Sequence, residues 1–211
     1  MMYLILGMWS GSLGLATSLI MRMELMQINK LLNNNSIYNM LITIHAFIMI
    51  FFMTMPITIG SLMNWLIPIM NGLPDMILPR MNNLSLLLLT PSLFLMMSSM
   101  LLNNSINTGW TLYPPLSNQN NSSIDMIIFS LHLNGLSSIL SSINILSSIM
   151  SNKTFLAKTN NLTLFTWASI NTTILLILSL PMLTSSLTMI LLDHNMNSSF
   201  FNPTGNGNPI L

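Results

Sequence analysis

The sequence contains no cysteine and very little charge. Without cysteine it can form no disulfide, thiolate metal site or catalytic thiol. Charged residues make up only 4% of the 211 positions, whereas a soluble domain carries about 25%. The five basic and four acidic side chains cannot cover a soluble globule of this size, and they leave no basic patch for nucleic acid. An ordinary soluble protein is therefore excluded.

Hydrophobic residues account for 52% of the chain. Disordered chains are poor in Leu, Ile and Phe, so the scarcity of charge does not indicate disorder. A lipid bilayer requires no charged surface, and it demands helices or closed barrels that satisfy their own backbone groups. The composition therefore predicts an integral membrane protein.

Five apolar runs are long enough to be transmembrane helices, since a crossing needs about 20 residues. The second run is too long for a perpendicular crossing, so we expect it to tilt or to project from the membrane. The first run has no basic leader, which argues against a signal peptide. The sequence predicts an all-α, polytopic transmembrane helix bundle. Residues 1–211 form a single partial membrane domain with spans at about 1–21, 37–70, 84–102, 124–150 and 162–192.

Two histidines lie inside the predicted spans, where ionisable side chains are costly and usually functional. His45 and His132 each follow the start of a span, and the two spans begin on the same side if the helices alternate in direction. Two interpretations are open from the residues alone. The imidazoles form a pair of axial haem ligands, or each bonds to a neighbouring helix.

The other polar residues fall mostly at span ends. Arg22 and Glu24 close the first span, and we expect them to form an interfacial ion pair. Asp75 lies in a proline-flanked turn, where a solvated carboxylate is ordinary. Asp125 precedes the fourth span, where a carboxylate suits a helix N-terminus. Serines recur along the fourth span, and they favour close helix packing or a water-filled proton path.

Motifs along nearly the whole chain resemble the cytochrome c oxidase subunit I family, a haem-copper oxidase family. The second span carries the haem-binding helix motif at Thr43–Met53. Further matches follow in order at 64–68, 74–76, 79–83, 109–116, 128–133, 199–203 and 208–211. The resemblance implies five spans of a larger, twelve-helix subunit.

The resemblance also implies an activity and a location. The full protein would be cytochrome-c oxidase, the terminal respiratory enzyme of oxidative phosphorylation. It would reduce oxygen to water with electrons from cytochrome c and would pump protons. It would be a multi-pass protein of the mitochondrial inner membrane. Its partners would be oxidase subunits II and III, cytochrome c through the complex, and the lipid bilayer.

By the same resemblance His45 is one axial ligand of haem a, and Arg22 contacts the formyl group of that haem. The second ligand lies beyond Leu211, so the resemblance does not support a pair of His45 with His132. The ligands of haem a3 and copper B also lie outside this segment. We therefore expect no catalytic residue in it and no oxidase activity from it alone. Glu24 matches a carboxylate of a sodium or calcium site, although Asn29 replaces a family glycine there.

A proton-uptake path is implied as well. Asp75 matches its mouth, and the polar positions along it are Asn64, Asn82, Ser85, Ser137 and Ser138. A carboxylate at the water face can collect protons, and buried amides and hydroxyls can hold a water chain. Tyr3 falls at a family tyrosine.

Several residues depart from the family pattern. The departures are Asn35, Asn134, Ser141, His194, Asn202 and Asn208. Asn35 stands where many animal members have aspartate, and His194 replaces an arginine. Two alternatives to the oxidase therefore stay open. One is a non-enzymatic polytopic protein, such as a transporter or assembly component, and the other is a decayed pseudogene copy.

Overall fold

The computed structural model describes residues 1–26, 31–32, 34–102, 106–118, 121–151 and 162–210. Helices dominate these residues, and no strand occurs among them. The helices are α1 (Met2–Met26), α2 (Asn35–Phe47), η1 (Ile48–Thr54), η2 (Pro56–Met63), α3 (Asn64–Asn71), α4 (Pro79–Leu101), η3 (Leu116–Asn118), α5 (Ser122–Met150), α7 (Leu164–Asn195) and η5 (Pro203–Gly205).

The long helices give five segments that are long and apolar enough to cross a membrane, as predicted. The segments α2, η1, η2 and α3 join into one continuous rod at 35–71, the overlong second span. This rod ends at Gly72, whose φ of 65° is the left-handed conformation that glycine adopts readily. The third span begins at Pro79, earlier than predicted, because proline is well tolerated in the first turn of a helix.

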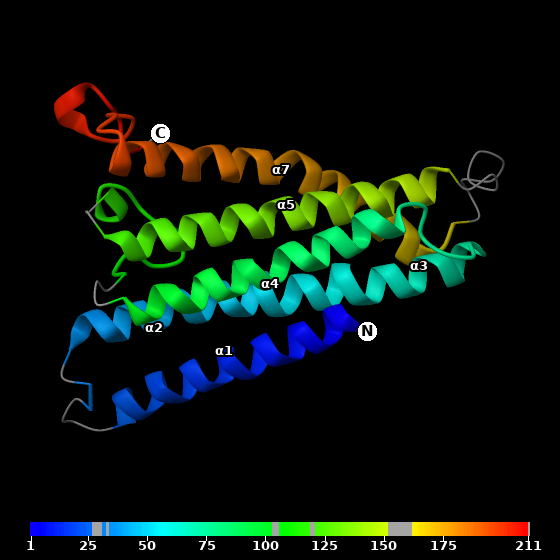
Figure 1. Ribbon diagram of the computed structural model, residues 1–211, viewed down its shortest axis with the longest axis horizontal. Helices are drawn as coiled ribbons and strands as arrows, with labels where there is room; N and C mark the ends of the chain where they lie inside the picture. Colours follow the sequence, from blue (N-terminus) through cyan, green and yellow to red (C-terminus); the bar gives the residue numbers. More distant parts are fainter. Residues whose placement is uncertain (27–30, 33, 103–105, 119–120, 152–161, 211) are drawn as a thin grey trace.

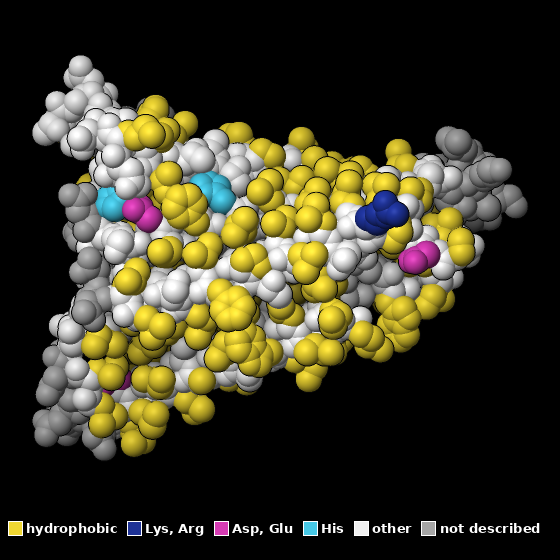
Figure 2. All heavy atoms as spheres, in the orientation of Figure 1, with side chains coloured by type: hydrophobic (Ala, Val, Ile, Leu, Met, Phe, Trp, Pro, Cys, Tyr) yellow, Lys and Arg dark blue, Asp and Glu magenta, His cyan; other side chains and the backbone are white. Residues whose placement is uncertain are grey.

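The five segments lie alongside one another, with α5 between α7 and α4 and with α1 at the far side of the second-span rod (Figure 1). α1 packs against α2, η1 and η2, while α5 packs against α4 on one side and α7 on the other. In the most apolar stretch of α5, 56% of the residues are buried inside the protein. In the corresponding stretch of α7, only 17% of the residues are buried. On the face that Figure 2 shows, hydrophobic side chains lie along the whole length of the bundle, and the few charged side chains lie toward its two ends. Such a surface suits lipid or further helices.

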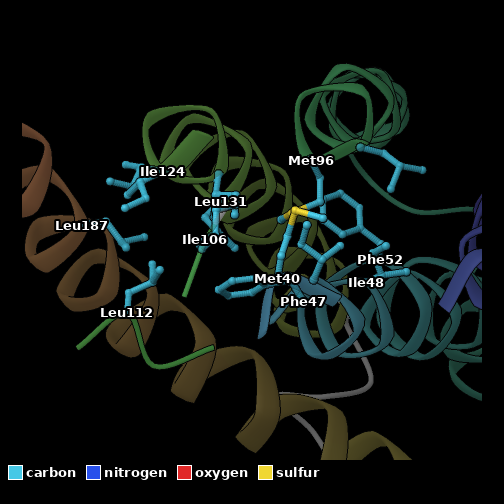
Figure 3. Close-up of a cluster of buried hydrophobic side chains, with 14 of the residues drawn as sticks. Met40, Phe47, Ile48, Phe52, Met96, Ile106, Leu112, Ile124, Leu131 and Leu187 are labelled. Atoms are coloured by element: carbon cyan, nitrogen blue, oxygen red, sulfur yellow. The ribbon is translucent and has the colours of Figure 1, made fainter. Parts of the chain in front are cut away.

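The main hydrophobic core fills the space between the second-span rod, α4, α5 and α7. Figure 3 shows side chains from these helices and from the 106–112 segment meeting there. Fully buried members include Phe52, Met96 and Ile128. A smaller cluster at the opposite end joins Ile67 to Ile145 and Ile149.

Pro56 lies within the continuous second-span rod, and π-helical turns lie on both sides of it. Proline has no N–H, so neither an α-helical bond to the carbonyl of Phe52 nor a π-helical bond to the carbonyl of Phe51 can form. Neighbouring helices donate instead. Ser10 Oγ of α1 lies 2.7 Å from Phe52 O, and Asn134 Nδ2 of α5 lies 3.1 Å from Phe51 O. An unpaired backbone carbonyl is costly in lipid. The two side-chain hydrogen bonds avoid that cost only while α1 and α5 stay packed against the rod, so they hold these helices in place.

Candidate functional site

His45 lies near the end of α2, partly buried against α1. Its Nδ1 lies 2.9 Å from the carbonyl oxygen of Gly14 and 3.2 Å from Thr17 Oγ1. A carbonyl can only accept, so Nδ1 carries the proton and donates it. Nε2 then bears the lone pair and has no hydrogen-bond partner among the described residues. A ligating histidine has this arrangement, with one ring nitrogen held by an acceptor and the other free for a metal.

His132 lies on α5 and contacts a different helix. Its Nε2 is 3.3 Å from the carbonyl oxygen of Thr184 on α7. This is the helix–helix hydrogen bond that the sequence left open as one interpretation. The ring nitrogen that this bond occupies cannot serve as a metal ligand at the same time.

Arg22 and Glu24 lie two positions apart on the last turns of α1. The predicted ion pair between them is wrong for the described part of the chain. Glu24 Oε2 instead accepts a hydrogen bond of 2.9 Å from the backbone N–H of Leu32, which fixes the connection to α2. Arg22 is exposed. Asn29 lies outside the described residues, and no group of three or more metal-binding side chains occurs within them.

Asp75 lies exposed in the connection between α3 and α4. Its Oδ1 accepts a 2.7 Å bond from the N–H of Met76. Two side chains of α5 hold the next residues: Ser148 Oγ accepts from Ile77 N, and Asn144 Oδ1 accepts from Leu78 N, each at 3.1 Å. The backbone beside Asp75 is thus held at one end of the bundle, and its carboxylate is exposed there.

A row of hydrogen-bonded polar groups runs inward from this end. The Tyr3 hydroxyl on α1 bonds to Ser85 Oγ on α4 and donates to the carbonyl of Asn82 at 3.0 Å. The side chain of Asn82 accepts a 2.9 Å bond from Asn64 Nδ2. Ser137 Oγ of α5 donates to the carbonyl of Ser85 at 2.7 Å. Four of the five polar positions predicted along the path therefore lie next to one another.

Three hollows follow the same row, and Tyr3 lines all of them. The outer one, of about 280 Å³, is lined by Asp75 and Asn82. The next, of about 340 Å³, is lined by Asn64 and Asn82. The innermost, of about 20 Å³, is lined by Ser137, Ser138, Ser141 and Asn134, and this volume suffices for one water molecule.

Asn64 Oδ1 is a buried acceptor without a protein partner among the described residues. A buried amide oxygen normally has a hydrogen bond from protein or water. Asn64 as a residue also lines the second hollow, but its Oδ1 atom is itself buried. The hollows themselves leave room for water beside Asp75 and beside the serines of α5.

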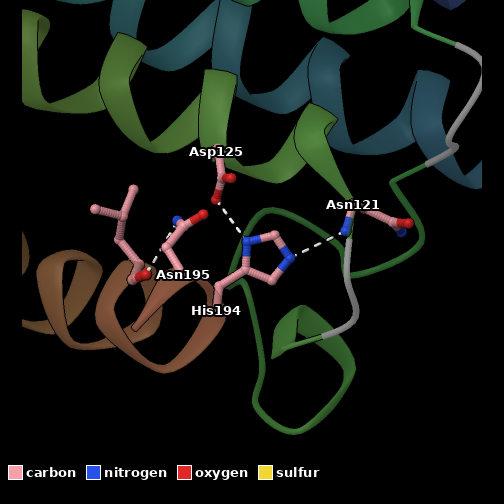
Figure 4. A network of polar contacts seen from close by, with 5 residues as sticks. Asn121, Asp125, His194 and Asn195 are labelled. Carbon is pink, nitrogen blue, oxygen red and sulfur yellow. Dashed lines mark hydrogen bonds and ion pairs between the residues drawn. The ribbon is translucent and has the colours of Figure 1, made fainter. Parts of the chain in front are cut away.

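The opposite end of the bundle holds a second polar cluster (Figure 4). His194 Nδ1 at the end of α7 lies 2.8 Å from Asp125 Oδ1 on α5, and Nε2 accepts a 3.0 Å bond from the N–H of Asn121. His194 thus pairs with a carboxylate of the neighbouring helix. Asp193 is buried beside it and accepts bonds from Ser198 Oγ and from the N–H groups of Phe200 and Phe201. These contacts fold the tail back onto α7.

Comparison with known proteins identifies the family to which these helices belong. The whole chain, residues 1–211, matches the family model described as cytochrome c and quinol oxidase polypeptide I. The chain belongs to this family. It is 44% identical over 214 residues to cytochrome c oxidase subunit 1 of Pecten maximus, and 42% identical over 214 residues to that of Mytilus edulis. It is 42% identical over 215 residues to that of Yarrowia lipolytica.

These alignments cover 100% of the chain and 45%, 39% and 40% of the Pecten, Mytilus and Yarrowia proteins. The chain therefore spans less than half the length of the polypeptide I relatives that it matches. The predicted family and the predicted all-α membrane fold are confirmed.

Within the polypeptide I fold, the structure shows contacts of three residues that could not be assigned from the sequence. Gly14 and Thr17 of α1 hold the ring of His45, and Tyr3 joins the hollows along the polar row. For Gly14 and Thr17, the only indication in the sequence was that glycines and a hydroxyl residue recur on one side of a helix. That signal indicates close packing in lipid, but it does not say which histidine lies opposite.

Proposed function

We propose that this chain is part of the catalytic subunit of cytochrome c oxidase, which reduces oxygen to water with electrons from cytochrome c and pumps protons. The observation that carries this proposal is the ring of His45, with Nδ1 held by Gly14 and Nε2 without a partner among the described residues. A haem bound there would accept and pass on single electrons. Family membership over the whole chain supports haem and copper as the cofactors of the whole protein.

In this proposal His45 is an axial ligand of haem a, and Arg22 contacts the formyl group of that haem. The exposed position of Arg22 leaves its guanidinium available for such a contact. The ligands of haem a3 and copper B lie outside these residues, so the segment alone has no oxidase activity. Glu24 stays a candidate ligand of a surface sodium or calcium ion. The whole protein lies in the mitochondrial inner membrane, in a complex with subunits II and III.

The histidine role is tested by replacing each intramembrane histidine in the full-length protein. His45→Leu should abolish the low-spin haem a absorption band of the purified complex, because the leucine has no lone pair for iron. His132→Leu is the matched control, since His132 sits on a facing helix and bonds to a backbone carbonyl. Retention of the band in His45→Leu would contradict the role of His45. Absence of the band from the wild-type complex would instead favour a non-enzymatic membrane protein.

We also propose that the polar row conducts protons inward from Asp75. Its members are Asp75, Asn64, Asn82, Ser85, Ser137 and Ser138, and the hydrogen bonds and hollows described above support the assignment. Asp75→Asn should lower oxygen turnover by about tenfold or more, because an amide cannot collect protons. Asp125→Asn is the control, since that carboxylate pairs with His194 away from the row. Equal turnover in the wild type and Asp75→Asn would refute this role.

A further inference from the structure

The hydroxyl group of Thr17 is the second neighbour of the His45 ring. Thr17 is buried on α1, and its Oγ1 lies 3.2 Å from His45 Nδ1. The same oxygen lies 2.7 Å from the carbonyl of Gly14, which is itself 2.9 Å from Nδ1. Three polar groups thus form a closed triangle at the back of the ring.

The protons of this triangle can be assigned from its chemistry. A threonine hydroxyl has one proton and two acceptor lone pairs. At 2.7 Å the hydroxyl proton points to the Gly14 carbonyl, which has no proton of its own. The Nδ1 proton of His45 then has two acceptors, the carbonyl oxygen and Thr17 Oγ1. Such a shared proton is a three-centre hydrogen bond.

Local packing holds the hydroxyl in place. Gly14 allows α1 to approach the second-span rod closely, since an added Cβ there would lie 3.0 Å from Met49 Cγ and even closer to its sulfur. The β-branched side chain of Thr17 has few rotamers in a helix. Its bond to the preceding turn selects one of them. The acceptor is therefore present before any ligand binds to His45.

We infer that Thr17 is a positioning residue for His45, and that its hydroxyl oxygen strengthens His45 Nε2 as a ligand by sharing the Nδ1 proton. The inference rests on the proposed role of His45 as a haem ligand. Acceptors on the distal N–H raise the basicity of a ligating imidazole and fix its orientation. A more basic ligand stabilises oxidised iron, so Thr17 lowers the reduction potential of the haem that His45 holds.

The test is a potentiometric titration of the low-spin haem band in the purified complex. Thr17→Val keeps the shape of the side chain and removes the acceptor. At the wild-type midpoint, the ratio of oxidised to reduced haem should fall about two- to fivefold, the effect of one lost hydrogen bond. This corresponds to a rise of about 20 to 40 mV, at 59 mV per tenfold for one electron. Thr17→Ser keeps the hydroxyl and should retain the wild-type potential.

Two further variants complete the design. Ser12→Ala removes another α1 hydroxyl, one that bonds to the carbonyl of Trp9 at 2.7 Å on the exposed side, and it should leave the potential unchanged. Thr17→Ala also removes the hydroxyl but introduces no branched side chain. It therefore measures the loss of the hydroxyl even if the valine of Thr17→Val disturbs the packing.

The outcomes separate the two proposals. An unchanged potential in Thr17→Val and Thr17→Ala, with the band intact, overturns the role of Thr17. An equal shift in Thr17→Ser also overturns it, because the methyl group would then be the cause. If His45→Leu keeps the band, the proposed role of His45 fails and this inference fails with it. If His45→Leu loses the band and Thr17→Val shifts nothing, only the inference about Thr17 is wrong.

Discussion

Gly60 is a position inside the bundle at which a single added methyl group should disturb the packing of two helices. It lies in η2, directly against the ring of Tyr3 on α1. A Cβ at this position would lie 2.7 Å from Tyr3 Cγ and 2.8 Å from Tyr3 Cε1. These ring atoms are rigid and close to their own backbone, so Gly60→Ala can be accommodated only by moving α1 away from the second-span rod.

The expected cost follows from this overlap. Overpacking by one methyl group destabilises a close-packed interior by about 1–3 kcal/mol. Alanine is also more favourable than glycine in a helix, by up to about 1 kcal/mol. This gain offsets part of the cost of the clash in the measured free energy of unfolding of Gly60→Ala. Gly135→Ala on α5 is the matched control. Its Cβ would meet only Thr184 Cγ2, at 3.4 Å, an ordinary contact. The difference between the two variants should therefore be about 1–3 kcal/mol, because the propensity gain is common to both.

The assay is the thermal unfolding of the two full-length variants, purified in parallel in the same detergent. Gly60→Ala should unfold at a lower temperature than the wild type, and Gly135→Ala at the same or a higher one. Proton uptake should fall in Gly60→Ala alone, because displacement of the Tyr3 ring breaks its bonds to Ser85 and Asn82. Equal stability of the two alanine variants would refute the reasoning, since the close approach of Tyr3 would then have no energetic consequence.

Two further predictions concern polar groups that the apolar core surrounds. Asn134→Ala should cost about 1 kcal/mol in unfolding experiments, because the carbonyl of Phe51 loses its donor. The cost should shrink in a Pro56→Ala background, which restores a backbone N–H, and an equal cost in both backgrounds would contradict this. Asp193→Asn turns one acceptor oxygen into a donor that faces backbone N–H groups, so the tail after α7 should be cleaved faster in limited proteolysis. Asn195→Ala, an exposed neighbour on the same turn, should leave the cleavage rate unchanged.

The membrane fold could be predicted from the sequence because its requirements are local. A span needs a continuous apolar run, and the chain has five of them separated by polar turns. His45 could be predicted as a candidate ligand because an ionisable side chain within a span is rare and costly. Asp75 could be singled out because a carboxylate stands in a turn between two spans. None of these predictions requires knowledge of which helices touch.

The partners of these residues could not be predicted in the same way. A helix that is apolar on every side carries no amphipathic pattern to say which face packs inward. The ion pair expected between Arg22 and Glu24 was wrong because side chains two positions apart on a helix point to different sides, and the structure gives Glu24 the N–H of Leu32. His194 likewise meets Asp125, which lies far from it in the sequence.

By itself the sequence determined that this protein lies in a membrane as a set of helices, and that a histidine and a carboxylate are its unusual groups. Only the tertiary structure decided that Gly14 and Thr17 face His45, and that Tyr3 joins the hollows between Asp75 and the serines of α5. The physical reason is that apolar length is a property of each segment. The direction of a hydrogen bond, in contrast, depends on the rotation and register of two helices that pack together.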